Sequence, residues 1–215
     1  MRPAASRPGK SVAAFVAENH ALAGINGGYF NHSDGWPVSH VTVAGRPITA
    51  PEDNKALTAN KVLAPHLPVI LNHRSEWRHV TTPNGPAWRI TNHDAAGPVR
   101  DALQAGPRLL PQLDLEGEAF VLRGAHGQVT RDGIGAMGLA TRSALGLKAD
   151  GTLLLVGVGA PGLRLQDLAT LMSSLGATEA LNLDGGSSSS LVWGKNAFHG
   201  GHAPARVNSV LLVGP

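Results

Sequence analysis

The pattern of hydrophobic and polar positions predicts two amphipathic helices. In residues 165–175, apolar side chains recur at i, i+3, i+6, i+7 and i+10, which places them on one face of a helix. Gly176 follows and is a suitable residue to end that helix. A shorter pattern in residues 11–23 begins at Ser11, a good N-cap, and stops before Gly24. We expect one helix at each place.

Short apolar runs that stop at turn residues predict many strands. The clearest pair is a hairpin formed by residues 141–147 and 152–158, which Asp150 and Gly151 join. Residues 50–62 are predicted to be helical only in part, and residues 124–138 to be a glycine-rich loop. Further short strands are expected at residues 25–30, 38–43, 67–71, 87–90, 101–110, 119–122, 181–183, 191–193 and 207–213.

Strands outnumber helices in this pattern, and the strongest helix lies late in the chain between two strands. This order predicts an α+β fold, with a mixed, twisted β-sheet core and a few packed helices. The 215 residues, 42% of them hydrophobic, suffice for one sizeable core. The 27 glycines and 15 prolines favour short strands and tight turns. We expect a basic tail at residues 1–10 and a single domain at residues 11–215.

Charge changes this picture only slightly. The formal net charge is +3, and lysines and arginines are scattered singly along the chain. Such a distribution does not favour nucleic acid, and it suits a small anionic substrate. No apolar run reaches the roughly 18 residues of a membrane span. No apolar segment typical of a signal peptide follows the basic N-terminus, so we expect a cytosolic protein or one whose export signal is absent from this sequence.

Several kinds of site are not supported by the sequence. There are no cysteines, which excludes disulfides, thiolate metal ligands and a cysteine nucleophile. Four histidines between Pro65 and Pro98 lack the spacing of a helical metal pair and are interpreted as solvated loop residues. No phosphate-binding loop of the nucleotide type is present. We therefore expect neither a metal nor another cofactor.

The stretch of residues 181–191 carries the most distinctive candidate chemistry. An apolar run ends at Asp184, and Gly185, Gly186 and Ser187 follow before the apolar pattern resumes. Glycines let backbone N–H groups approach a ligand, and hydroxyls can donate to anionic oxygen. A carboxylate at a strand end beside such a turn suits chemistry on a polar, anionic substrate. The alternative is an ordinary Asp-Gly hairpin turn with exposed serines.

Other breaks in apolar strands supply further candidates. Asn26 precedes Gly27 and Gly28, where a strand is interrupted. Glycine inside a strand often marks a bulge or a close approach by a ligand or another backbone. Asn26 either satisfies a buried turn or binds a substrate hydroxyl. Gly106 breaks another strand, and Arg142 opens the first strand of the hairpin among apolar neighbours, which favours a partly buried, paired arginine.

The order and spacing of these pieces resemble the phosphodiester glycosidase family, the family of the lysosomal uncovering enzyme and its bacterial relatives. The resemblance extends from residue 24 to the C-terminus, although Ser187 stands where the family often has a third glycine and residues 65–98 match nothing in the pattern. The matching pieces are residues 26–30, Gly106-Pro107, residues 142–146, residues 175–177, residues 182–188 and residues 206–208.

The resemblance implies hydrolysis of a sugar-1-phosphodiester, such as an N-acetylglucosamine-1-phosphodiester or one from an exopolysaccharide, at the anomeric carbon. Asp184 would act as nucleophile or base, Arg142 and Arg206 would bind phosphate, and Asn26 would orient a sugar hydroxyl. The glycines and Ser187 would line the substrate site: Gly27, Gly28, Gly106, Gly185 and Gly186. A partner carboxylate stays open among Asp101, Asp132 and Glu179. Asn26, Gly106, Arg142, Asp184 and Gly185 should then converge on one cleft.

Two other function classes remain as alternatives. A carbohydrate- or phosphoglycan-binding module without turnover is compatible with the strand-rich pattern and four tryptophans. A serine hydrolase at Ser187 is disfavoured, because no Gly-x-Ser-x-Gly motif surrounds it. The sugar, the aglycone and the oligomeric state stay open.

Overall fold

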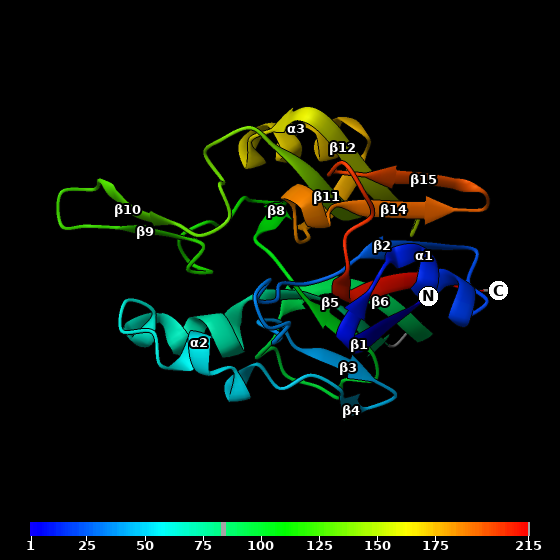
Figure 1. Ribbon diagram of the computed structural model, residues 1–215, viewed down its shortest axis with the longest axis horizontal. Helices are drawn as coiled ribbons and strands as arrows, with labels where there is room; N and C mark the ends of the chain where they lie inside the picture. Colours follow the sequence, from blue (N-terminus) through cyan, green and yellow to red (C-terminus); the bar gives the residue numbers. More distant parts are fainter. Residues whose placement is uncertain (83–84, 215) are drawn as a thin grey trace.

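Three antiparallel β-sheets share one hydrophobic core in the computed structural model, which describes residues 1–82 and 85–214. Ile25, Leu145, Leu181 and Leu211 come from two of these sheets, and Trp77 comes from the third; all five are buried in the same cluster. Because the sheets pack on each other through this cluster, they form a single α+β domain, as the sequence predicts. Figure 1 shows both chain ends close together at one side of the molecule.

The first sheet carries the two ends of the chain, and its strand order is β1-β16-β2-β14-β15. Its strands are β1 (Arg2–Lys10), β16 (Val207–Val213), β2 (Ala23–Asn26), β14 (Ser190–Trp193) and β15 (Asn196–His199). Helix α1 (Val12–Glu18) packs on it through Val12 and Phe15. Ser11 caps this helix as predicted, by accepting from the Ala14 N–H at 3.2 Å, but the helix ends earlier than expected because the Asn19 side chain caps the Phe15 carbonyl.

Strand β1 corrects the expectation of a basic tail at residues 1–10. It pairs antiparallel with β16, with Arg2 opposite Leu212 and Lys10 opposite Val207. Strand β16 is almost wholly buried, so its outer edge needs backbone partners that only a neighbouring strand can supply. The pairing is irregular between Ala5 and Lys10, where the register shifts.

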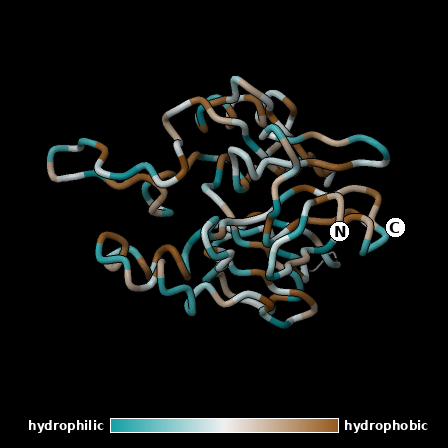
Figure 2. Tube along the Cα trace, in the orientation of Figure 1, coloured by the Kyte–Doolittle hydropathy of each residue, from teal (hydrophilic) through white to brown (hydrophobic). Residues whose placement is uncertain are grey.

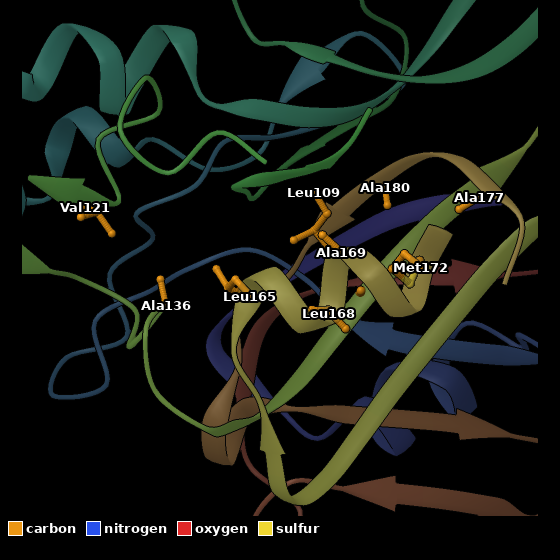
Figure 3. Packing of buried hydrophobic residues seen from close by; sticks show 10 residues of the cluster. Leu109, Val121, Ala136, Leu165, Leu168, Ala169, Met172, Ala177 and Ala180 are labelled. Carbon is orange, nitrogen blue, oxygen red and sulfur yellow. The ribbon is translucent and has the colours of Figure 1, made fainter. Parts of the chain in front are cut away.

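The second sheet has the order β12-β11-β13-β8 and lies under helix α3 (Figure 1). Its strands are β12 (Leu153–Leu163), β11 (Ala140–Lys148), β13 (Ala177–Asn182) and β8 (Arg108–Leu110). Figure 3 shows Leu168, Ala169 and Met172 of α3 (Leu165–Ser174) beside Leu109 and Ala180 of the sheet. The predicted hairpin and late helix are confirmed, and Gly176 has the positive φ, 86°, expected after a helix.

The third sheet has the order β4-β3-β7-β5-β6. Its strands are β4 (Arg46–Pro47), β3 (Val41–Val43), β7 (Ala102–Gln104), β5 (Ser75–Thr82) and β6 (Gly85–Asn92). Trp77 and Trp88 stack across β5 and β6, with ring centroids 5.2 Å apart. Trp77 is fully buried in the shared core, so this sheet closes the core on one side.

Short helices and one small hairpin lie outside these sheets (Figure 1). The helices are η1 (Pro51–Asp53), α2 (Lys55–Thr58), η2 (Ala64–His66) and η3 (Val69–His73), and η4 (Gly186–Ser188) forms a turn of the candidate site. The hairpin consists of β9 (Val121–Arg123) and β10 (Val129–Asp132), and Figure 2 shows its tip in hydrophilic colours. Among the described residues, no helix is both long and apolar enough to cross a bilayer.

Two predictions in this outer region were wrong. Residues 67–71 were expected as a strand, but Leu67 and Pro68 have helical dihedrals and lead into η3. A short apolar run does not distinguish a strand from a buried helical turn, and Ile70 is buried here against Leu57 and Leu63. Residues 124–138, expected as a loop, contain β10, because β9 offers it an antiparallel partner.

Candidate functional site

Asp184 lies just beyond the end of β13, in the turn that leads to β14. Its backbone N–H donates to the Gly27 carbonyl at 3.0 Å. The side chain is 9% exposed, and its Oδ1 accepts from the Gly185 N–H at 2.9 Å. Within the described chain, Oδ2 lacks a hydrogen-bond partner of good geometry. A buried carboxylate oxygen with spare capacity can accept a substrate proton or attack a carbon.

The surroundings of Asp184 keep its carboxyl close to titration near neutral pH. Burial raises the pKa of Asp184 from 3.8 to about 6, and three smaller effects oppose the rise. These are the nearby Ser188 hydroxyl, the charge of His32 and the Gly185 amide. A raised carboxyl pKa of this kind is common at catalytic positions, because it makes proton exchange possible at working pH.

Asn26 braces the Asp184 turn from the first sheet. Its Nδ2 donates to the Asp184 carbonyl at 2.7 Å, and its Oδ1 accepts from the Ser190 N–H at 2.9 Å. The residue is fully buried. The two ends of the Asn26 amide therefore fix the backbone on both sides of the turn. This is the first of the two roles considered for Asn26 from the sequence, in which it satisfies a buried turn. A contact with a sugar hydroxyl stays a prediction.

Gly27 and Gly28 are where three chain segments meet closely. A Cβ at Gly27 would lie 2.5 Å from the Ser209 hydroxyl, and a Cβ at Gly28 would lie 2.3 Å from the Gln104 carbonyl. The Gly28 N–H donates to the Ser209 Oγ at 3.0 Å. No side chain fits at either glycine, because protein atoms already fill the space. Packing is therefore sufficient to explain both glycines, and their contact with substrate stays a prediction.

Tyr29 links this turn to Gly106. Its hydroxyl donates to the Gly106 carbonyl at 2.6 Å and accepts from Asn182 Nδ2 at 2.9 Å. Burial, and secondarily the charge of Asp184, raises the pKa of Tyr29 far above its usual value, so the hydroxyl stays neutral. Tyr29 was not among the site residues predicted from the sequence. The sequence does contain a feature that could have indicated Tyr29 as a site residue: it is the only tyrosine in the sequence, and it directly follows Asn26-Gly27-Gly28.

A second buried carboxyl, that of Glu118, lies beside Gly106. A Cβ on Gly106 would lie 2.5 Å from Glu118 Oε2. Glu118 accepts from the Ser75 N–H at 2.9 Å, the Ser75 hydroxyl at 2.8 Å and the Arg108 N–H at 2.9 Å. Burial raises the pKa of Glu118 above its usual range. The sequence analysis missed this residue, and no local pattern distinguishes it.

Arg74 is a buried cation beside Glu118. Its guanidinium carbon lies 3.8 Å from the centroid of the Phe120 ring, and its Nε donates to the Glu118 carbonyl at 3.0 Å. Burial lowers the pKa of Arg74 to about 10, and the nearby Tyr29 and Glu118 oppose that shift. The arginine therefore remains charged at neutral pH.

Arg142 lies next to Gly185 and holds the loop of residues 134–138. Its Nε donates to the Leu163 carbonyl, Nη1 to the Ile134 carbonyl, and Nη2 to the carbonyls of Gly135 and Gly138. The residue is 2% exposed, and a Cβ on Gly185 would lie 3.8 Å from its Nη1. Arg142 is thus next to the Asp184 turn, with most of its donors committed to backbone.

Comparison with known proteins decides the family. The sequence profile of the phosphodiester glycosidases matches residues 19–214. The chain belongs to the phosphodiester glycosidase family. No curated protein sequence matches it.

Several solved structures have a similar fold. A putative exported protein from Burkholderia pseudomallei is 17% identical with a TM-score of 0.70, covering 100% of this chain and 71% of the other. The catalytic domain of zebrafish N-acetylglucosamine-1-phosphodiester alpha-N-acetylglucosaminidase, auto-inhibited by its pro-peptide, is 16% identical with a TM-score of 0.69, covering 96% and 67%. A hypothetical protein from Synechocystis is 19% identical with a TM-score of 0.65, covering 97% of this chain; this chain spans 55% of its length.

The structure brings five predicted residues together. Asn26 contacts Asp184, Gly185 caps Asp184 and approaches Arg142, and Gly106 joins the group through Tyr29. Gly186 has a φ of 60° and opens the short helix η4, in which Ser187 is exposed. The Thr141 hydroxyl donates to the Gly186 carbonyl at 2.7 Å and fixes this turn to β11.

None of the three carboxylates considered as a partner has a hydrogen bond with Asp184. The Asp101 side chain accepts from the Ala44 N–H, and that of Glu179 accepts from the Ile90 N–H. Asp132 accepts from the N–H groups of Ala136 and Met137, in the loop that Arg142 also holds. All three are tied to backbone elsewhere, so Glu118 is the other carboxyl linked to the Gly106 group.

Arg206 lines a cavity of about 610 Å³ together with Arg7 and His32. Its Nε donates to the Gly9 carbonyl at 2.9 Å. In the part of the chain that the structure describes, no group of three or more His, Asp or Glu residues is arranged to hold a metal ion.

Proposed function

We propose that this chain hydrolyses a sugar-1-phosphodiester at the anomeric carbon and releases a free sugar and a phosphomonoester. Membership of the phosphodiester glycosidase family supports the reaction class. The zebrafish relative is, by its name, an N-acetylglucosamine-1-phosphodiester glycosidase, and we propose the same substrate class for this chain. The exact sugar and aglycone are left open.

The observation that carries the proposal is the state of the Asp184 carboxyl. It is buried at a glycine-rich turn, one oxygen has no partner of good geometry among the described residues, and its pKa is about 6. Above that pH the carboxylate can attack the anomeric carbon or take a proton from water. The departing phosphomonoester is a stable anion, so the reaction needs less help from a general acid than cleavage of an ordinary glycoside.

The Tyr29 hydroxyl and the Arg142 guanidinium would act on the Asp184 carboxylate indirectly. The Tyr29 hydroxyl stays neutral and, with Asn182, supports the backbone around Gly106. Two roles are compared for Arg142: binding the phosphate, as the family resemblance implies, and holding the loop at the site through its contacts with four backbone carbonyls. These two roles of Arg142 make different predictions, which are given below.

The position of bond cleavage tests the proposal. The purified chain is incubated with an N-acetylglucosamine-1-phosphodiester in heavy-oxygen water, and the products are followed by phosphorus NMR and mass spectrometry. Cleavage at the anomeric carbon places the heavy oxygen in the sugar. A label in the phosphate would mean phosphodiesterase chemistry and would contradict the proposal.

The Asp184→Asn variant is the control for this experiment. It should bind the same substrate and release no labelled sugar. Binding by the wild-type chain without any turnover would instead support a carbohydrate- or phosphoglycan-binding module.

A further inference from the structure

A basic cavity lies between the end of β1, the loop of residues 31–36 and the start of β16. Its volume is about 610 Å³. The side chains that matter for its chemistry are Arg7, Phe30, His32, Asp34, Arg206 and Asn208. Neither the hydrolytic role of Asp184 nor the packing of the core accounts for two arginines and a histidine around one hollow.

The walls of this cavity are held in place by hydrogen bonds. Arg206 Nε donates to the Gly9 carbonyl at 2.9 Å, which ties β16 to β1. Asn208 Nδ2 donates to the Gly35 carbonyl, which ties β16 to the loop. The loop is closed on itself, because the Asn31 N–H donates to the Trp36 carbonyl at 2.8 Å. A ligand would therefore meet a shape that is already formed, which lowers the entropic cost of binding.

The cations of the cavity keep donors that the protein does not use. Arg206 is exposed, and among the described residues its two terminal amino groups have no hydrogen-bond or ion-pair partner. Arg7 lies 3.6 Å from the centroid of the Trp36 ring and, within that same part of the chain, makes no ion pair. The one carboxylate on the wall, Asp34, accepts from the Trp36 N–H at 2.9 Å. Two guanidinium groups without an ion-pair partner among the described residues, against one engaged carboxylate, make the cavity attractive to an anion.

Two features link the cavity to the Asp184 site. His32 packs on Phe30, with ring centroids 4.7 Å apart, and its charge acts on the Asp184 carboxyl. Ser209, next to Asn208 on β16, accepts from the N–H groups of Gly27 and Gly28 with its carbonyl and hydroxyl oxygens. Strand β16 thus contacts Gly27 and Gly28 through Ser209 and lines the cavity through Asn208.

We propose that this cavity binds the phosphate of the leaving group, with Arg206 and Arg7 as its cationic ligands and His32 on the side of Asp184. The inference rests on the proposed function and extends it to the phosphate side of the substrate. When the bond from the anomeric carbon to oxygen breaks, its electron pair stays on the phosphate oxygen, so negative charge grows on the phosphate. Guanidinium groups pair with phosphate oxygens in a bidentate way and stabilise that charge.

Arg7 makes the proposal specific to this chain. It lies in β1, outside residues 19–214 that match the family profile. The N-terminal strand would then contribute directly to substrate binding, in addition to completing the first sheet.

Phosphate binding tests the inference without any need for turnover. Inorganic phosphate and methyl phosphate are titrated into the full chain at low ionic strength and followed by calorimetry and tryptophan fluorescence, with Trp36→Phe to assign the signal. We expect saturable binding that weakens about tenfold in Arg206→Ala and in Arg7→Ala, with partial recovery in Arg206→Lys. Arg89→Ala removes an exposed arginine of β6 and is the matched control; it should bind as the wild type does.

The outcomes separate this inference from the proposed function. If both variants bind phosphate as tightly as the wild type, or if the wild type binds none, the cavity is not the phosphate subsite, even where hydrolysis is observed. If phosphate binds as expected but no phosphodiester is hydrolysed, the subsite stands and the reaction is wrong. Where turnover is measured, Arg206→Ala should slow a phosphodiester about tenfold more than an aryl glycoside with an uncharged leaving group.

Discussion

Two buried carboxyl groups, those of Asp184 and Glu118, differ in what surrounds them. Burial raises the pKa of both. Glu118 accepts three hydrogen bonds from Ser75 and Arg108, whereas Asp184 accepts one from Gly185 and leaves its Oδ2 without a partner of good geometry among the described residues. Burial alone therefore does not identify a reactive group; burial with unused bonding capacity does.

The arginines show the same contrast. Arg142 is 2% exposed and donates to four backbone carbonyls, whereas Arg206 is exposed and, among the described residues, donates only through its Nε. The first is built into the scaffold, and we propose that the second binds a ligand with its terminal amino groups. The four experiments below ask whether this division between structural and reactive charges holds.

The largest expected effect is on turnover in Asp184→Asn. Asparagine can still accept from the Gly185 N–H but cannot act as nucleophile or base, so the rate should fall on the order of ten-thousandfold, about 5.5 kcal/mol. Steady-state kinetics on a sugar-1-phosphodiester measures it. Asp150→Asn, at an exposed hairpin turn, is the control. A loss of less than about tenfold would remove Asp184 from the chemistry.

Glu118→Ala should act on stability instead. It leaves the buried N–H groups of Ser75 and Arg108 and the Ser75 hydroxyl without an acceptor, and we expect the free energy of unfolding to fall by about 4 kcal/mol. Chemical denaturation measures this. Glu116→Ala, which removes a largely exposed carboxylate from the same segment, should change stability by no more than about 1 kcal/mol. Unchanged stability in Glu118→Ala would contradict the structural role.

Arg142→Ala should lower the rate on the order of a hundredfold, about 3 kcal/mol, and Arg142→Lys should recover part of that loss. The comparison of substrates distinguishes the two roles of Arg142. A loss confined to phosphodiesters means that the guanidinium binds phosphate. An equal loss on an aryl glycoside means that it acts by holding the loop of residues 134–138. Arg89→Ala controls for the removal of one positive charge.

The smallest effect concerns pH. Folding raises the pKa of Asp184 from 3.8 to about 6, so the folded chain holds a proton that the unfolded chain releases between these values. The stability that this proton confers is present at low pH and is lost as the pH rises through about 6. Asp184→Asn lacks this titration, so its stability relative to the wild type should increase by roughly 2 to 3 kcal/mol from about pH 4 to about pH 7.5.

Denaturation of both proteins at a series of pH values measures this difference. Glu118 and the other titrating groups are common to both proteins and largely cancel. A difference that does not change with pH would mean that the Asp184 carboxyl is not buried in the way described.

The parts of the fold that could be predicted from the sequence are those with a strong local pattern. Helix α3, β11 and β16 were predicted to within one residue of their observed bounds, because apolar periodicity and turn residues are local signals. Strand β12 was predicted to end at Val158 but continues to Leu163. The Asp184 turn stood out for the same reason, since a carboxylate, two glycines and a row of serines interrupt an apolar run.

Sequence alone determined the class of the fold, the family resemblance and the position of the candidate carboxylate, since each depends on neighbours in the chain. Only the tertiary structure decided which charged groups are free. The sequence does not distinguish Arg142 from Arg206. In the structure, the Arg142 guanidinium donates to backbone carbonyls of residues 134–138, whereas Arg206 lines a cavity. Residues 1–10 form a strand because β16 needs an edge partner, and that requirement comes from a segment about 200 residues away. Hydrogen-bond satisfaction and burial are set by contacts between distant segments, which no local pattern records.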